Sequence, residues 1–160
     1  MNPVALDPDL QLTPINGDPR TVREWVTNFH LLVCAVDPYT NESSWILPTA
    51  TKILSELGGA DVRVAWLSTS SAADARAFLG PLAEEFLTFA DPDRVAVKGL
   101  GVGRLPALVH VGTDVSVVGK AEGWHRDEWG GVCHRLATVM SWVTPTIGAS
   151  APSAFEGSLV

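Results

Sequence analysis

Residues 30–59 read HLLVCAVDPYTNESSWILPTATKILSELGG, and this stretch decides the fold. The run from His30 to Val36 is short and continuously apolar, and Asp37-Pro38 ends it. Such a run is typical of a central strand that is covered on both faces. From Asn41 to Gly58 apolar residues recur at helical spacing, which predicts a helix packed against that strand. Pro48 lies inside this helix and should kink it, because proline removes a backbone hydrogen bond.

Further strands and helices alternate on both sides of this unit. The expected strands are residues 62–67, 86–89, 107–111 and 115–121, and the expected helices are residues 18–29, 71–79, 91–99 and 126–143. Strands separated by helices form right-handed parallel crossovers, and the last two strands form a hairpin. The order predicts an α/β chain: a three-layer α/β/α sandwich around a mixed five-stranded sheet.

The chain divides into one domain and two terminal segments. Residues 1–17 are rich in Pro and Asp without a sustained period, and we expect an extended N-terminal arm. Residues 18–143 carry all the strong patterns and form the domain. Residues 144–160 are small, Pro- and Ser-rich and aperiodic, which predicts a disordered tail.

Composition excludes several kinds of partner. The 160 residues carry a formal net charge of −7, and no cluster of Lys and Arg is present. Nucleic acids and anionic membranes are therefore not expected as partners, since both need a basic surface. The longest apolar runs are too short to cross a bilayer. The N-terminus lacks the pattern of a signal peptide, which predicts a cytoplasmic location.

The element order and its landmarks resemble the thioredoxin superfamily. The resemblance covers roughly residues 22–143, and the extra strand and helix within residues 62–93 are more similar to its TlpA and peroxiredoxin branches than to short thioredoxins. The segments that carry it are HLLVCAVDPYTNESSWILP (30–48), LTFADPD (87–93) and GVGRLPALVHVGTDVSVVGKAEGW (101–124). The resemblance implies a thioredoxin-like fold with Pro106 at the position of a cis-proline beside the active site.

The redox motif of that superfamily is absent. Its pattern is Cys-x-x-Cys with a helix proline five residues after the second Cys, so Pro48 aligns the motif with Thr40-Asn41-Glu42-Ser43. Disulfide exchange needs a thiolate of lowered pKa, and a hydroxyl stays protonated near neutral pH. The resemblance without its cysteines implies a redox-inactive member, and we favour a protein that is not an enzyme.

The two cysteines of the chain stand elsewhere. Cys34 lies in the predicted central strand and Cys133 in the predicted last helix, so neither replaces the lost pair by position. We interpret both as buried free thiols. The four histidines show no metal-ligand spacing. No metal and no cofactor is expected.

A binding face can remain where the redox site is lost. The carboxyl end of a central strand is where ligands bind in open α/β sheets, although Thr40 or Asn41 could simply cap the helix. Trp45 stands one position off the apolar row, so it is either exposed for a partner or covered by the N-terminal arm. The candidate partner-binding residues are Tyr39, Trp45, Arg104, Leu105, Trp124 and Phe155.

Three functional hypotheses follow. The first is a protein–protein interaction subunit, adaptor or chaperone-like factor that binds a protein partner through residues 40–45 and 104–106. The second is an enzyme or binding protein for a low-molecular-weight thiol, with Ser43 or Thr40 in place of cysteine. The third is an atypical thiol oxidoreductase that uses Cys34 or Cys133.

Overall fold

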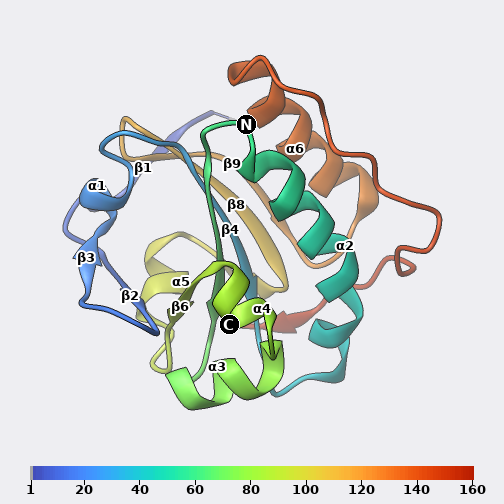
Figure 1. Cartoon of the computed structure of the whole chain (residues 1–160), viewed down its shortest axis with the longest axis horizontal. Helices are drawn as coiled ribbons and strands as arrows, with labels where there is room; N and C mark the ends of the chain where they lie inside the picture. The colour runs from blue at the N-terminus through green and yellow to red at the C-terminus, as the bar shows by residue number, and fades with distance from the viewer. Residues whose placement is uncertain (1) are drawn as a thin grey trace.

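An eight-stranded mixed sheet forms the centre of the structure, a computed structural model that describes residues 2–160 (Figure 1). The strand order is β1-β9-β8-β4-β5-β6-β2-β3, and a separate pair joins β10 to β7. The strands are β1 Val4–Ala5, β2 Gln11–Pro14, β3 Arg20–Thr21, β4 Leu31–Val36, β5 Arg63–Ser68, β6 Leu87–Ala90, β7 Arg104–Leu105, β8 Ala107–Gly112, β9 Ser116–Glu122 and β10 Ser158–Leu159. The helices are α1 Val22–Trp25, α2 Asn41–Gly58, α3 Ala72–Leu79, α4 Leu82–Glu85, α5 Val95–Gly99 and α6 Arg126–Val139.

The expectation of five strands is wrong, because the N-terminal arm contributes strands of its own. The five expected strands form the middle of the sheet: β4, β5 and β6 run parallel, β8 pairs with β4 in the antiparallel direction, and β9 pairs with β8 as the second strand of the hairpin. β1 pairs with β9 at one edge, while β2 pairs with β6 at the other and carries β3. Leu12 in β2 is fully buried, so the arm belongs to the core. These strands contain only two to four residues, too few for a period to show.

The two faces of the sheet are covered by different elements. Successive side chains of a strand point to opposite faces. In β4, Leu32 and Cys34 therefore pack in the cluster that contains α2 and α6, while Val33 packs with α1, α5 and the N-terminal arm. Every residue of β4 is buried. This strand is the centre of a three-layer arrangement.

Three helices differ from their sequence predictions at the ends, and one of them is α5, which begins at Val95 and not at Asp91. α1 begins at Val22 and not after Asp18, because Thr21 and Glu24 form a capping box in which each side chain accepts from the other residue's backbone N–H. α6 ends at Val139, four residues before the expected end at Val143.

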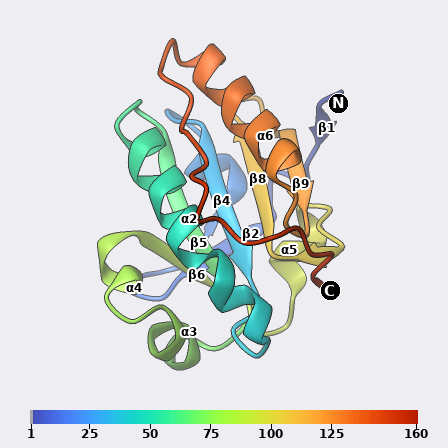
Figure 2. The same ribbon diagram turned by 90° about the vertical axis from the view of Figure 1, so that its right-hand side faces the viewer.

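The C-terminal segment, expected to be disordered, follows a defined path in the structure. Figure 2 shows it in dark red across the gap between α2 and α6. Arg126 donates to the carbonyl oxygens of Ile147 and Gly148, and Lys52 Nζ donates to that of Thr146. Side chains of the domain bind backbone carbonyls of the tail, and such contacts do not require apolar residues at a regular spacing in the tail sequence. For that reason composition alone does not reveal the docking.

Candidate functional site

The start of α2 follows directly after β4 and holds the two hydroxyls at the aligned cysteine positions. Thr40 Oγ1 lies 3.0 Å from Ser43 Oγ and donates to the Asp37 carbonyl at 3.2 Å. Ser43 is fully buried, and its Oγ accepts the backbone N–H of Asp37 at 3.2 Å. The two hydroxyls therefore close a turn of the chain. Asn41 and Glu42, between them, form the first helical turn.

Asp37 connects this turn to neighbouring elements. Its carboxylate accepts the Tyr39 backbone N–H at 2.9 Å and pairs with Arg94 Nη2 at 3.2 Å. The side chain of Tyr39 is exposed and reaches α3, where its hydroxyl donates to Asp74 Oδ2 at 2.5 Å. That hydrogen bond raises the pKa of Tyr39. Arg94 also donates through Nη1 to the carbonyl of Leu159, so the ion pair reaches the C-terminal tail.

The segment before β8 completes the same end of the sheet. Ala35 of β4 pairs with Ala107 of β8, so the residues that follow β4 and those that precede β8 lie at the same end of the sheet. The peptide bond between Leu105 and Pro106 is cis. Just before it, β7 is held by Glu122, whose Oε1 accepts the backbone N–H groups of Gly103 and Arg104.

The tail pairs with β7 at this edge. Ser158 stands opposite Leu105 and Leu159 opposite Arg104 in an antiparallel ladder. The backbone N–H of Val160 extends the ladder by donating to the Gly103 carbonyl at 3.0 Å. The edge of β7 is therefore occupied by an extended segment of the same chain.

Aromatic side chains surround the path of the tail. Trp45 is 53% exposed, and its ring meets that of Phe155 edge to face at 5.6 Å between centroids. The C-terminal tail, and not the expected N-terminal arm, covers part of Trp45. Trp124 is buried, exchanges two backbone hydrogen bonds with Phe155, and donates through Nε1 to the Pro152 carbonyl.

Two glycines make this docking possible. Gly157 has φ +79°, and a Cβ there would lie 2.0 Å from the Leu105 carbonyl oxygen. Gly123 has φ +70°, and a Cβ there would lie 2.6 Å from the Glu156 carbonyl oxygen. Either side chain would clash with backbone, which cannot move aside cheaply. These two glycines are the functional positions that sequence reasoning missed. In the sequence they appear as a glycine directly before Trp124 and a glycine within the tail.

The structure brings most of the predicted site residues to one end of the sheet. Trp45, Phe155 and Trp124 line the path of the tail, and Arg104-Leu105 pairs with it. Tyr39 faces α3 instead. Trp124 is only 1% exposed and is covered in this arrangement.

The two cysteines lie away from this end, inside the layer between the sheet and α2 and α6. Both are fully buried. Burial raises the pKa of the Cys133 thiol to about 12, with a smaller contribution in the same direction from Glu56, and burial also raises the pKa of Cys34. At neutral pH both are protonated thiols, which are poor nucleophiles.

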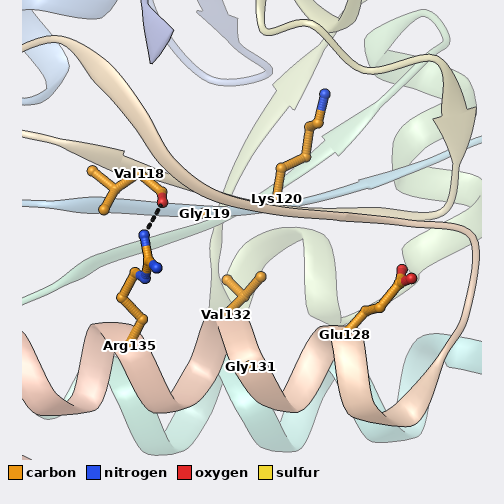
Figure 3. Close-up of a pocket in the computed structure, with 7 residues that line it drawn as sticks. All are labelled: Val118, Gly119, Lys120, Glu128, Gly131, Val132 and Arg135. Atoms are coloured by element: carbon orange, nitrogen blue, oxygen red, sulfur yellow. Dashed lines mark hydrogen bonds between the residues drawn. The ribbon is translucent and has the colours of Figure 1, made fainter. Parts of the chain in front are cut away.

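A cavity of about 250 Å³ lies elsewhere, between β9 and α6 (Figure 3). Its basic side chains already have partners: Arg135 Nη1 donates to the Val118 carbonyl, and Lys120 Nζ donates to the Gly101 carbonyl and pairs with Glu122. Within residues 2–160, no three His, Cys, Asp or Glu side chains are grouped so that they could hold a metal ion. In the same part of the chain, no helix is long and apolar enough to cross a membrane.

Solved structures share this architecture. A putative thiol:disulfide interchange protein DsbE from Chlorobium tepidum superposes with a TM-score of 0.69 at 13% identity, covering 88% of this chain and 98% of that one. A mutant of Xanthomonas campestris peroxiredoxin Q gives 0.67 at 16% identity, covering 86% and 96%. A secreted Mycobacterium tuberculosis disulfide oxidoreductase homologous to E. coli DsbE gives 0.59 at 16%, covering 81% and 96%. No protein-family model and no curated protein sequence matches the chain. The chain has the thioredoxin-like α/β fold found in DsbE-type proteins and peroxiredoxin Q.

Proposed function

We propose that this chain is a thioredoxin-fold binding protein, without disulfide exchange at the start of α2. It acts as an interaction subunit, adaptor or chaperone-like factor for a protein partner. The observation that carries the proposal is the edge of β7, which accepts an extended segment by antiparallel pairing next to the half-exposed Trp45. Pairing with a free sheet edge is a general mode of peptide recognition.

The names of the structural neighbours concern thiol chemistry, so the aligned positions deserve a chemical test. Thr40 and Ser43 carry hydroxyls, which cannot form a mixed disulfide. The same network also argues against polarisation of a bound thiol, because Ser43 is buried and both hydroxyls are engaged with each other and with the backbone of Asp37. The hypothesis based on Cys34 or Cys133 is opposed by their burial.

A gain-of-function variant tests the first half of the proposal. The native chain should reduce insulin disulfides no faster than dithiothreitol alone. The double substitution Thr40→Cys/Ser43→Cys should raise that rate at least tenfold, because it places thiols at the start of a helix, where the N-terminus lowers their pKa. Activity of the native chain above the dithiothreitol background would contradict the proposal.

A capture experiment tests the second half. The tagged native chain and two tryptophan variants are incubated with cytosol from the source cells. We expect a stoichiometric partner that Trp45→Ala loses and Trp142→Ala keeps, because Trp142 is similarly exposed but packs against α2 through a hydrogen bond to the Glu56 carbonyl. Equal capture by both variants, or no capture by the native chain, would remove the binding proposal.

A further inference from the structure

The last six residues of the chain are attached to the β7 edge as a peptide ligand would be. We infer that residues 155–160, Phe-Glu-Gly-Ser-Leu-Val, are an internal ligand of this edge. The external ligand is then an extended peptide of the same chemistry: an aromatic residue, glycine two positions later, and an aliphatic residue three positions after the glycine. The inference rests on the proposed function, since it names the peptide class that the binding protein recognises.

The backbone of the tail is recognised at both ends. Phe155 exchanges two hydrogen bonds with Trp124, of 2.8 and 3.0 Å. At the other end Val160 donates to the Gly103 carbonyl at 3.0 Å, and the Leu159 carbonyl accepts from Arg94 at 3.2 Å. These contacts depend on main-chain groups that any extended peptide has.

The side chains define a pattern. Phe155 packs between Trp45 and the core layer of α2 and α6, and Val160 packs against the core on the other face of the sheet. Leu159 is 69% exposed, so its position sets no side-chain requirement. Gly157 is required by geometry, because the Leu105 carbonyl occupies the space where a Cβ would lie.

Ser158 shows that the tail is not the best ligand for its own site. Its Oγ is buried and has no hydrogen-bond partner among residues 2–160. Burial of an unpaired hydroxyl opposes docking. An external peptide with alanine at this position avoids that penalty and can displace the tail, although the tail has the advantage of being tethered at an effective concentration in the millimolar range.

The test uses the full-length chain and a labelled peptide of sequence PSAFEGSLV, followed by fluorescence anisotropy. The chain variant Gly157→Ala cannot dock its tail, so its edge is free. We expect it to bind the peptide at least tenfold more tightly than the native chain does. Gly148→Ala is the matched control in the same tail, because its Cβ would meet only Ser150 Oγ at 3.8 Å, and it should bind as the native chain does.

Peptide variants test the pattern on the Gly157→Ala chain. Replacing the glycine of the peptide by alanine should weaken binding at least tenfold, and replacing the serine that follows this glycine, the counterpart of Ser158, by alanine should strengthen binding several-fold. The inference is overturned if both chains bind the peptide equally, or if the glycine-to-alanine peptide binds as well as the original.

A measurement on the native chain guards against a folding defect of the variant. The amides of Phe155 and Val160 should be protected from hydrogen exchange and lose that protection when the peptide is added at millimolar concentration. Unchanged protection at saturating peptide would also overturn the inference. If Trp45→Ala loses the captured partner but no chain binds the labelled peptide, the internal-ligand inference is refuted and the adaptor function stands. Peptide binding without a captured partner would refute the adaptor function and leave the peptide site.

Discussion

The turn before α2 illustrates how single side chains change the chemistry that a fold can perform. The sequence alignment on Pro48 predicts that Ser43 replaces a redox cysteine, and in the structure its hydroxyl accepts the buried backbone N–H of Asp37. Thr40 joins the same set of hydrogen bonds. This hydrogen bond gives Ser43 a structural role, and a substrate that used the hydroxyl would have to break the bond.

This role predicts the effect of Ser43→Ala. The substitution leaves the Asp37 N–H without its acceptor in a buried turn, and we expect the free energy of unfolding to fall by about 1–2 kcal/mol. Ser44→Ala is the control, because Ser44 is exposed and its hydroxyl bonds only the carbonyl of Asn41 one turn back, so it should change stability by less than about 0.5 kcal/mol. Urea denaturation of both variants measures the difference. Equal stability of the two would show that Ser43 is free for another task.

His110 is a second buried polar residue, at the opposite end of β8. It is fully buried, and its Nε2 lies 2.8 Å from Nδ1 of His30, so the two nitrogens can share one proton but not hold two. The pKa of His110 is lowered to about 4, mainly by burial and in smaller part by the nearby His30 and Arg135, against the opposite influence of Asp114.

This shift makes stability depend on pH. Because the folded pKa lies below the ordinary value of 6.5, the unfolded chain binds more protons between pH 4 and 6.5. Stability is therefore complete above pH 6.5 and falls as the pH is lowered, by about 2 kcal/mol at pH 5. His110→Leu should remove this part of the slope, whereas His134→Gln, on exposed α6 surface, should keep it. Urea denaturation at pH 5 and pH 7 gives the comparison, and an equal slope in His110→Leu and the native chain would contradict it.

At the scale of elements, α6 contains two adjacent glycines, Gly130 and Gly131, beside which the structure leaves room for a side chain. A Cβ on Gly131 would meet no heavy atom within 4 Å, and one on Gly130 would make only an ordinary contact with Ile147 Cδ1 at 3.9 Å. Gly131 borders the cavity between α6 and β9 (Figure 3). Neither glycine has a positive φ, so neither is required by the backbone.

Gly131→Ala should therefore stabilise the chain. Alanine loses less conformational freedom than glycine on folding, and we expect a gain of about 0.5–1 kcal/mol in the free energy of unfolding. Gly123→Ala provides the contrast, since its positive φ and the close Glu156 carbonyl should make that variant less stable. Thermal denaturation of the two variants separates the cases. A destabilised Gly131→Ala would mean that the open space beside α6 is needed.

Elements with many residues of one period were predictable, and short ones were not. β4, α2 and the hairpin β8–β9 carry runs of apolar residues at strand or helix spacing, and the structure places them within a residue or two of the expected ends. β1, β3 and β10 contain two residues each, and pairing of such segments is set by partners distant in the sequence. The sheet was therefore predicted with too few strands.

At the scale of the whole molecule, the candidate site joins segments from three parts of the chain. Residues 37–45 and 104–106 could be placed together from the strand order, because both lie at the same end of adjacent strands. The tail could not be placed in this way, because an aperiodic sequence does not indicate which strand it pairs with. Phe155 was predicted to bind a protein partner, whereas in the folded molecule it contacts Trp45 and Trp124 of its own chain.

The positions of Cys34 and Cys133 make them reporters of the whole fold. Both lie in the same layer, between the sheet and α2 and α6, and both are fully buried, so a reagent reaches either thiol only when that layer opens. When a thiol reacts only after this layer opens, its labelling rate follows the unfolding equilibrium. The labelling rate should therefore rise with the concentration of urea in parallel with global unfolding. We expect both thiols to react with the same dependence on urea, measured by mass spectrometry after iodoacetamide labelling. Cys34→Ala and Cys133→Ala assign each signal. Rapid labelling of one thiol without urea would instead reveal a local opening, and it would revive the hypothesis of thiol chemistry at that cysteine.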